Sequence, residues 1–333
     1  MGAVIFVLTG LLVYAKGGPC EAASRSAIRL RVGYSSISGS AVIPWIAVDK
    51  GIFGKYDLEV ELIYIGSGTS AMQSLLSGTT QIGVQGIEPV MRVNAQGSDT
   101  VMIAGLVTKP PFSMIVRPEI REPKDLKGKA MGVSRYGSTT DLLLRLTLEK
   151  WGLRPEVDVA IIQMGGVPPI LSGMQSKTIV GGPISLPTLA IAKQEGFREL
   201  VDLSEVIPDY QAAGVVTRRS FIRQNPEVVR NFIRSIGEAI AVFKTNLAFS
   251  KKIIKERLKI DNSLVQEETQ RTYINYVPRV PYPSRPGIAL AKSFMDKTEP
   301  SVRPLSIDDQ LDVSFVRELE QSGFFNGLYQ SLR

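Results

Sequence analysis

Short strand-like runs alternate with helical stretches from residue 28 onward, and this order constrains the fold more than any other feature. The runs predicted as strands are rich in aliphatic and β-branched residues, and they occupy 30–34, 58–63, 81–85, 100–107, 129–133, 157–163 and 178–180. Helices are predicted between them, over 42–50, 69–77, 139–151, 167–175 and 186–194. Because strands that alternate with helices form open, mostly parallel sheets, the chain is predicted to be an α/β protein.

The last third of the chain is predicted to be helical. Between 226 and 249 apolar residues recur in steps of three and four, the pattern of one buried helical stripe, and they are Val229, Phe232, Ile236, Ile240, Phe243 and Leu247. Asn225 and Pro226 supply an N-cap and a first-turn proline, so this helix is predicted to begin there.

Two extended runs, 113–117 and 213–218, flank the middle third of the chain. If the chain crosses at both runs, a lobe built from both chain ends joins a lobe built from the middle. We therefore predict that residues 24–115 and 213–333 form lobe 1 and that residues 116–212 form lobe 2. Any ligand cleft of such a chain would lie between the two lobes.

The first residues predict export. Residues 3–15 are almost wholly apolar, but as a helix they would reach only about 20 Å, short of the ~30 Å hydrocarbon core. A signal peptide over 1–23 is therefore predicted, and with it a periplasmic or other extracytoplasmic location. An uncleaved membrane anchor stays open because no Lys or Arg precedes Lys16. The proline immediately before Cys20 argues against lipidation of that cysteine.

The chain lacks several kinds of catalytic and metal-binding side chain. It has no His and one Cys, which excludes Ser-His-Asp and Cys-His machinery, His-ligated zinc and an intrachain disulfide. No pair of carboxylates recurs in its loops, where Glu88 and Asp141 are the nearest acids. We therefore predict a protein that is not an enzyme and that holds neither a cofactor nor a metal.

Loops rich in Gly, Ser and Thr follow the predicted strands in both lobes. In open α/β sheets ligands bind beyond the carboxyl ends of the strands, where free N–H groups at helix starts and hydroxyl groups can hold an anion. The predicted ligand-binding residues are Ser35, Ser36, Ser67, Gly68, Thr69, Gln85 and Gly86 in lobe 1, and Arg135, Tyr136, Gly137, Ser138, Thr139, Gly166, Val167 and Ser185 in lobe 2. Simple N-capping is the alternative for each loop, since Ser138 and Asp141 resemble a capping box.

Some of these side chains have two interpretations that the residues leave open. Arg135 is the one cation inside the loops, either a bidentate clamp for a carboxylate or sulfonate or a solvated charge. Tyr136 and Trp45 would enclose a ligand, although core packing is the alternative for Trp45. Gln85 would offer an amide, or end its strand in a plain turn. A turn over 181–183, next to Ser185, is predicted to face the cleft.

Several stretches, in their order and spacing, resemble the nitrate/sulfonate/taurine-type substrate-binding proteins of ABC transporters. They are PWIAVDKGIFGKYDLEVELIYIGSGTSAMQSLLSG, DLKGKAMGVSRYGSTTDLLLRLTLEKWGL, GFRELVDLSEVIP and DVSFVRELEQSGFF, and the likeness covers about 29–325. The resemblance implies the type II periplasmic binding protein fold, with two lobes, a ligand cleft between them, mixed and mostly parallel sheets, and two crossover segments. Relatives usually carry an acidic residue where Gln81 and Thr178 stand, so their ligand is not carried over to this chain.

The resemblance implies an extracytoplasmic solute-binding protein of an ABC importer. Its expected ligand is a small anionic organic molecule of the sulfonate, carboxylate or nitrogen-compound class, and its expected partners are the permease and ATPase complex at the membrane. We expect a monomer. We expect no binding of nucleic acid, because the excess of positive charge is concentrated over 218–259, which holds 11 cations and 3 anions. The alternatives are a ligand-sensing ectodomain of the same fold and, more remotely, an enzyme of the pyrimidine synthase or desulfinase type.

Overall fold

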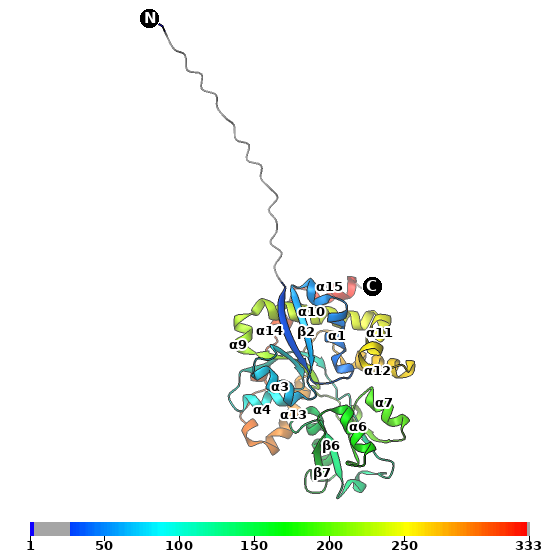
Figure 1. Ribbon diagram of the computed structural model, residues 1–333. Coiled ribbons are helices and arrows are strands. Elements are labelled where there is room, and N and C mark those ends of the chain that lie inside the picture. The colour runs from blue at the N-terminus through cyan, green and yellow to red at the C-terminus, as the bar shows by residue number, and fades with distance from the viewer. Residues whose placement is uncertain (3–26, 332–333) are drawn as a thin grey trace.

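Two five-stranded sheets organise the residues that the computed structural model describes, which are 1–2 and 27–331 (Figure 1). The leader predicted over 1–23 lies, apart from its first two residues, outside the described residues. The first sheet has the order β2-β1-β3-β10-β4 and consists of β1 (Ile28–Tyr34), β2 (Leu58–Tyr64), β3 (Ile82–Gln85), β4 (Thr100–Val107) and β10 (Ala213–Arg218). The second has the order β7-β6-β8-β5-β9 and consists of β5 (Ser113–Val116), β6 (Ala130–Val133), β7 (Ala160–Gln163), β8 (Gly181–Ile184) and β9 (Arg198–Asp202).

Each sheet is mixed and mostly parallel, as predicted. In the first sheet β1 pairs in parallel with β2 and β3, while β10 runs antiparallel to β3 and β4. In the second sheet β6 pairs in parallel with β7 and β8, while β5 runs antiparallel to β8 and β9. The chain thus has the predicted α/β class and two crossover segments. The runs 113–117 and 213–218, predicted as the crossings, instead form β5 and β10, and each crossing lies just before one of these strands.

The chain passes between the sheets over 108–112 and again over 203–212. The first passage lies before the predicted boundary at 115, because β5 belongs wholly to the second sheet. Pro110 and Pro111 end the extended run of β4 before β5 begins, since proline cannot donate to a strand ladder. From here on, lobe 1 denotes the part of the chain built on the first sheet, and lobe 2 denotes 113–202.

Helices cover both faces of each sheet. Those of lobe 1 are α1 (Val42–Asp49), α2 (Ile52–Lys55), α3 (Gly68–Leu76), α4 (Glu88–Asn94), α9 (Arg219–Gln224), α10 (Pro226–Thr245), α11 (Leu247–Leu258), α12 (Ser263–Tyr276), α13 (Arg285–Thr298), α14 (Ser314–Gln321) and α15 (Phe324–Ser331). Lobe 2 and the second crossover contribute α5 (Thr139–Lys150), α6 (Val167–Gln175), α7 (Thr188–Gln194) and α8 (Leu203–Val206). Short 3-10 turns lie at Gly39–Ala41, Pro123–Leu126, Pro300–Val302 and Asp308–Gln310.

Two predicted elements are wrong in the structure. The strand predicted over 178–180 is displaced to β8, which contains the Gly-Gly-Pro run that predicted a turn. Glycine is required at 181 and 182 because a side chain there would overlap the carbonyl oxygens of Ile115 and Gly132 on the neighbouring strands. The single helix predicted over 226–249 breaks at Asn246, whose side chain accepts a hydrogen bond from the N–H of Phe249 and so caps α11.

Buried apolar side chains form two clusters, and each cluster runs from one lobe into the other. One joins α1, α10 and α11 to α6 and α7, and the other joins α3, α4 and α13 to α5. Within the first, the stacked rings of Phe53 and Phe232 lie 5.3 Å apart. Because each cluster contains residues of both lobes, the two lobes are packed together rather than held apart.

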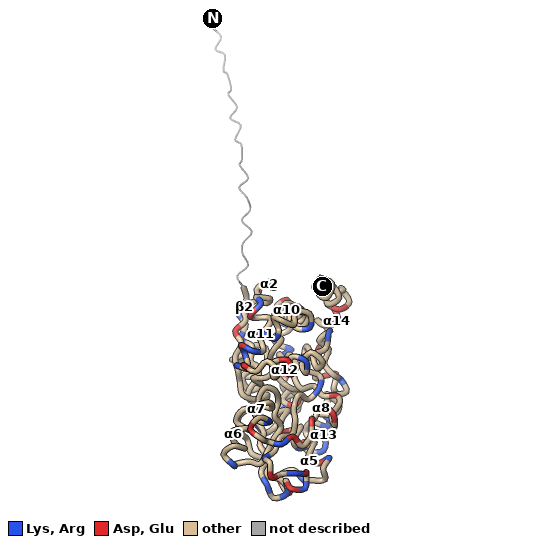
Figure 2. Tube along the Cα trace, turned by 90° about the vertical axis from the view of Figure 1, so that its right-hand side faces the viewer, with Lys and Arg blue, Asp and Glu red and all other residues tan. Residues whose placement is uncertain are grey.

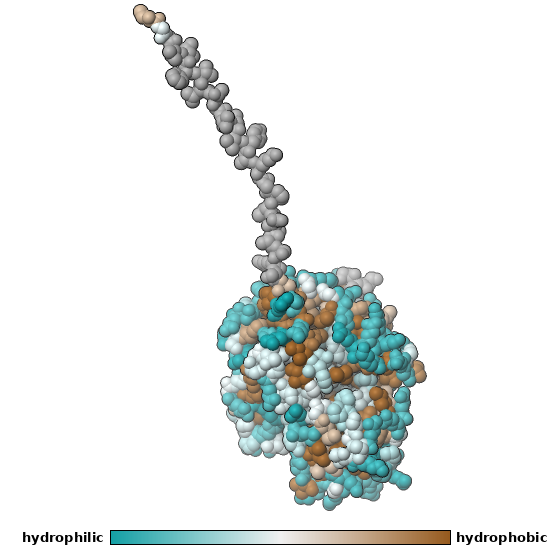
Figure 3. All heavy atoms as spheres, viewed as in Figure 1, coloured by the Kyte–Doolittle hydropathy of each residue, from teal (hydrophilic) through white to brown (hydrophobic). Residues whose placement is uncertain are grey.

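Hydrophilic residues cover much of the outer face, with apolar residues in scattered patches (Figure 3).

The cations of the C-terminal third lie on outer helices of lobe 1. Lys251, Lys252, Lys255 and Arg257 belong to α11, which is on the surface of the molecule (Figure 2). Three of them form ion pairs: Lys251 with Glu267, Lys252 with Glu256, and Arg257 with Asp49. Among the described residues, no helix has the length and apolar character needed to cross a membrane.

Candidate functional site

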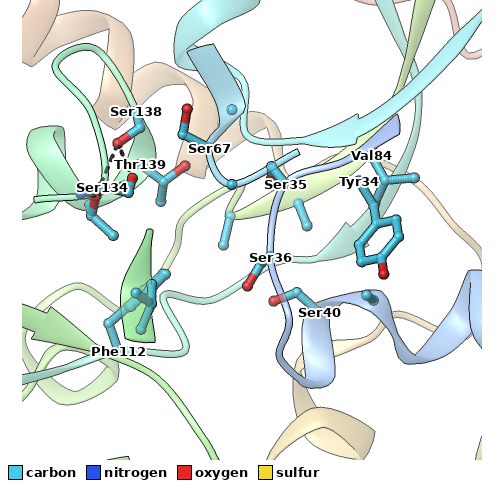
Figure 4. Close-up of a pocket in the computed structure, with 17 residues that line it drawn as sticks. Tyr34, Ser35, Ser36, Ser40, Ser67, Val84, Phe112, Ser134, Ser138 and Thr139 are labelled. Carbon is cyan, nitrogen blue, oxygen red and sulfur yellow. Dashed lines mark hydrogen bonds between the residues drawn. The ribbon is translucent and has the colours of Figure 1, made fainter. Parts of the chain in front are cut away.

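A pocket lies between the two lobes at the carboxyl ends of their strands (Figure 4). The centre of a water molecule could occupy about 50 Å³ of it, which is room for about four waters. Its walls come from loops of both lobes and from both crossovers: Tyr34, Ser35, Ser36, Ser40, Ala41, Gly66, Ser67, Gly68, Val84, Phe112, Ser134, Ser138, Thr139, Thr140, Val167, Ala212 and Ala213.

Three helices begin at this pocket. Gly68, Thr139 and Val167 are the first residues of α3, α5 and α6, and all three line it. A helix start carries a partial positive charge and N–H groups with no partner inside the helix. The pocket therefore offers an electropositive environment although, of the described residues that line it, none has a charged side chain.

The three helix starts differ in how their N–H groups are satisfied. Ser67 caps α3 by accepting a hydrogen bond from the N–H of Ser70 at 3.2 Å. Ser138 makes no cap bond to α5, and its hydroxyl donates to the carbonyl oxygen of Arg135 at 2.7 Å. Asp141 accepts from the N–H of Gly137 and not from that of Ser138, so the capping-box alternative is wrong. Among the described residues, no side chain caps the first N–H groups of α5, which are available to a ligand.

Hydrogen bonds close the lobes over the pocket. The hydroxyl of Thr69 donates to the carbonyl oxygen of Tyr136 at 3.0 Å, and the hydroxyl of Thr139 donates to the carboxylate of Glu88 at 3.0 Å. The guanidinium of Arg92 on α4 donates to the carbonyl oxygen of Gly137. Each bond joins lobe 1 to lobe 2, so the loops that line the pocket also hold it shut.

Glu88 lies directly behind the pocket wall and is fully buried. Its carboxylate accepts hydrogen bonds from Thr139 and from the hydroxyl of Tyr210 on the second crossover. Burial raises the pKa of Glu88, while the hydrogen bond from Tyr210 and the nearby charge of Arg92 act to lower it. Burial, together with the negative charge of Glu88, raises the pKa of Tyr210 well above its ordinary value.

The predicted site residues fall into two groups. Those that line the pocket are Ser35, Ser36, Ser67, Gly68, Ser138, Thr139 and Val167. Those that do not are Thr69, Gln85, Gly86, Arg135, Tyr136, Gly137, Gly166 and Ser185. Among the second group, Gly166 is the N-cap residue of α6, and a side chain at Gly86 would overlap Thr139 and Glu88.

The structure places Arg135 outside the pocket. Its side chain is exposed at the tip of a loop that turns at Gly137, where φ is +77°. Tyr136 is 43% exposed, and its hydroxyl donates to the carbonyl oxygen of Ile161 at 2.7 Å, on the surface of its own lobe. Neither side chain reaches the pocket in this arrangement, so the bidentate clamp is not formed.

Gln85 and Ser185 are buried beside the pocket rather than in its wall. The amide atoms of Gln85 have no hydrogen-bond partner among the described residues. Trp45 is 2% exposed and packs edge-on against Tyr34, with ring centroids 5.9 Å apart, which is the packing role.

Several lining residues were not predicted. Phe112, Ala212 and Ala213 come from the ends of the crossovers, and Tyr34 and Val84 are at the ends of β1 and β3. Both crossovers must pass the cleft in any chain with two lobes. The residues that flank Pro110 and Pro111 could therefore have been predicted from the sequence to lie at the pocket. Among the described residues, no group of three or more acidic or Cys side chains gathers as a metal site.

Comparison with known proteins supports the same type of molecule. A putative binding protein of Brucella abortus (strain 2308) is 29% identical over 248 residues, covering 73% of this chain and 76% of that protein. The alkanesulfonate-binding protein SsuA from Xanthomonas axonopodis pv. citri, solved with MOPS, has a TM-score of 0.70 at 18% identity, covering 89% of this chain and 99% of SsuA.

The periplasmic nitrate-binding protein NrtA from Synechocystis PCC 6803 has a TM-score of 0.68 at 14% identity, covering 92% of this chain and 89% of NrtA. These structural likenesses show the periplasmic binding protein fold that the sequence predicts. All three relatives are named as binding proteins and not as enzymes, in agreement with the prediction. The sequence model described as NMT1/THI5 like matches residues 42–246, and the chain therefore belongs to the NMT1/THI5-like family.

Proposed function

We propose that this protein is the extracytoplasmic solute-binding component of an ABC importer. It captures a small organic ligand that bears an anionic group, and it delivers that ligand as a monomer to a permease and ATPase complex at the membrane. The observation that carries the proposal is the meeting of three helix starts in one pocket between two lobes. The names of the sulfonate-binding and nitrate-binding relatives support it.

The anionic group is held by backbone N–H groups at the starts of α3 and α5. The start of α6 contributes less, because its second and third residues are Pro168 and Pro169, which have no N–H. Each bond from an N–H group to an anion replaces a bond to water, and the partial charge of the helix start adds typically 0.3–1 kcal/mol. Binding by dipoles instead of a fixed cation suits a protein that must also release its ligand.

A panel of small acids tests the proposal through the melting temperature of the purified protein. Sulfonates, carboxylates, nitrate and ureides are added one at a time, and a ligand that binds only the folded state raises the melting temperature with its concentration. Mass spectrometry of the denatured protein identifies any ligand that copurifies. A panel with no shift and no copurified ligand would refute the proposal.

A paired substitution tests the site itself. Changing Ser138 and Thr139 together to Ala is expected to weaken ligand binding at least tenfold, because two groups in the wall of the pocket are lost. The matched control changes Ser176 and Thr178 to Ala, since these side chains bond each other at 3.0 Å on the outer surface of the same lobe. Equal affinity in the two double variants would contradict this assignment. Uptake of the labelled ligand by cells that lack the protein tests the coupling to transport.

A further inference from the structure

Ser134, Ser138 and Thr140 form a triangle of hydroxyl groups in the lobe 2 wall of the pocket, and Figure 4 labels the first two. The oxygen–oxygen distances along its sides are 2.8, 2.9 and 3.0 Å. Each of these side chains is no more than 5% exposed. The hydrogens of these hydroxyls can be assigned from their contacts within the wall.

Each hydroxyl has one hydrogen to donate and two lone pairs. Ser138 gives its hydrogen to the carbonyl oxygen of Arg135, because a carbonyl oxygen can only accept. Ser134 and Thr140 then hold the two hydrogens that remain for the three sides of the triangle. Thr140 also accepts a hydrogen bond from the N–H of Ser134 at 2.9 Å, which occupies one of its two lone pairs. If either hydrogen turned toward a ligand, two close oxygen pairs would have no hydrogen between them. The triangle therefore presents only lone pairs to the pocket.

The hydroxyl hydrogen of Thr139, in the same wall, also has a fixed acceptor. It donates to the carboxylate of Glu88, which is fully buried and is held from its other side by Tyr210. The oxygen of Thr139 that faces the pocket therefore accepts as well. Glu88 does not line the pocket, and it acts as a positioning residue that fixes the direction of this hydrogen.

The wall formed by lobe 1 differs. Ser35 lines the pocket, and its hydroxyl makes no hydrogen bond within the part of the chain that the structure describes. Tyr34 also lines it, but its ring packs against Trp45 and Tyr64 and points away from the serine hydroxyls (Figure 4). The Ser35 hydroxyl is free to donate to a ligand, as are the N–H groups at the start of α3. A ligand thus meets groups able to donate on lobe 1, and hydroxyl groups that can only accept on lobe 2.

We propose that the ligand carries an N–H or O–H donor beside its anionic group, and that this donor lies against the hydroxyls of Ser134, Ser138, Thr139 and Thr140. The ligand class is then a small amino-, hydroxy- or amide-substituted acid. This inference rests on the proposed function, because it assigns a ligand to the same pocket. A plain acid of equal size would leave several buried lone pairs without a partner, which is how a hydrogen-bonding site rejects an analogue that lacks the donor.

Pairs of probes that exchange the donor for a methyl group test the proposal. Taurine is compared with 1-propanesulfonate, β-alanine with butyrate, and glycolate with propionate, by calorimetry and melting temperature on the purified protein. In each pair that binds, the donor-bearing member is expected to bind at least tenfold more tightly. Equal or tighter binding of the methyl-bearing member would overturn this inference and leave the proposed function standing. Binding by no member of any pair would count against both.

A substitution in the wall provides the second test. Thr139→Val keeps the shape of the side chain but removes the acceptor, so the preference for the donor-bearing probe is expected to fall at least fivefold. The control is Thr147→Val on the same helix, because Thr147 is buried and donates to the carbonyl oxygen of Leu143, within α5. An unchanged preference in Thr139→Val, with the fold verified by circular dichroism, would refute the role given to this hydroxyl.

Discussion

Gly66 lies in a loop of lobe 1 that approaches the backbone of lobe 2 closely. A Cβ atom at Gly66 would lie 2.6 Å from the carbonyl oxygen of Gly165, across the pocket. Real Cβ contacts essentially never fall below 3.0 Å, and ordinary contact begins at 3.4 Å. Because the obstructing atom belongs to the backbone, it cannot turn aside as a flexible side chain would. In Gly66→Ala the two loops must therefore separate by 0.4 to 0.8 Å, the differences between 2.6 Å and these two limits.

The cost of this separation falls on the closed arrangement of the lobes. Forcing one additional methyl group into a packed interface costs about 1–3 kcal/mol, which corresponds to a loss of ligand affinity of about 5- to 150-fold. Gly66 itself lies outside the sheets and outside both core clusters, in the loop between β2 and α3. We therefore expect the free energy of unfolding without ligand to change by less than about 0.5 kcal/mol, as for most surface substitutions.

Calorimetry with a ligand from the panel measures the affinity, and urea unfolding measures the stability. Spin labels at two exposed positions, Glu61 on β2 and Ser172 on α6, report the distance between the lobes in the presence of that ligand. The control is Gly54→Ala, because a Cβ atom there meets nothing within 4 Å. If Gly66→Ala bound as tightly as the control and closed to the same distance between labels, the steric reasoning would be refuted.

Two further predictions concern stability. Phe232→Ala is expected to lower the free energy of unfolding by about 3–5 kcal/mol in urea titrations, because Phe232 is fully buried and stacks on Phe53; a loss below about 1 kcal/mol would contradict this. Burial acts to raise the pKa of Asp99, but hydrogen bonds from Arg218 and Ser220 lower it from 3.8 to about 2. The unfolded chain then binds more protons between these two values, so this part of the stability is present above 3.8 and is lost as the pH falls to about 2. Asp99→Asn should reduce the acid dependence in that window, and an unchanged slope of stability against pH would show that Asp99 does not contribute.

The sequence predicts elements well where one local signal dominates. The aliphatic run over 100–107 is β4 to the residue, and α6 begins and ends as predicted. The prediction from sequence fails at β8, because the Gly-Gly-Pro run has a strong turn propensity when it is considered alone. Only the close approach of the neighbouring strands makes glycine necessary there, and that approach is a tertiary property.

The site shows the same division. The loops that begin α3, α5 and α6 could be found from their composition, since Gly, Ser and Thr at strand ends have a physical reason to hold a ligand. The direction in which an individual side chain points could not be predicted from composition. Arg135 points outward because the loop turns at Gly137, and Phe112 enters the pocket because the crossover passes it.

Because β4 pairs with β10, lobe 2 is an insertion between two adjacent strands of the first sheet. Val107 ends β4 and Ala213 begins β10, and these two residues are partners in an antiparallel ladder, so they lie about 5 Å apart. In topological terms the whole segment 108–212 stands in the place of a hairpin turn. Exchange of this segment with that of a relative needs two junctions at adjoining residues, and the rest of the chain keeps its path. In such a chimaera, any ligand preference that depends on the lobe 2 wall is expected to be that of the protein from which the segment was taken.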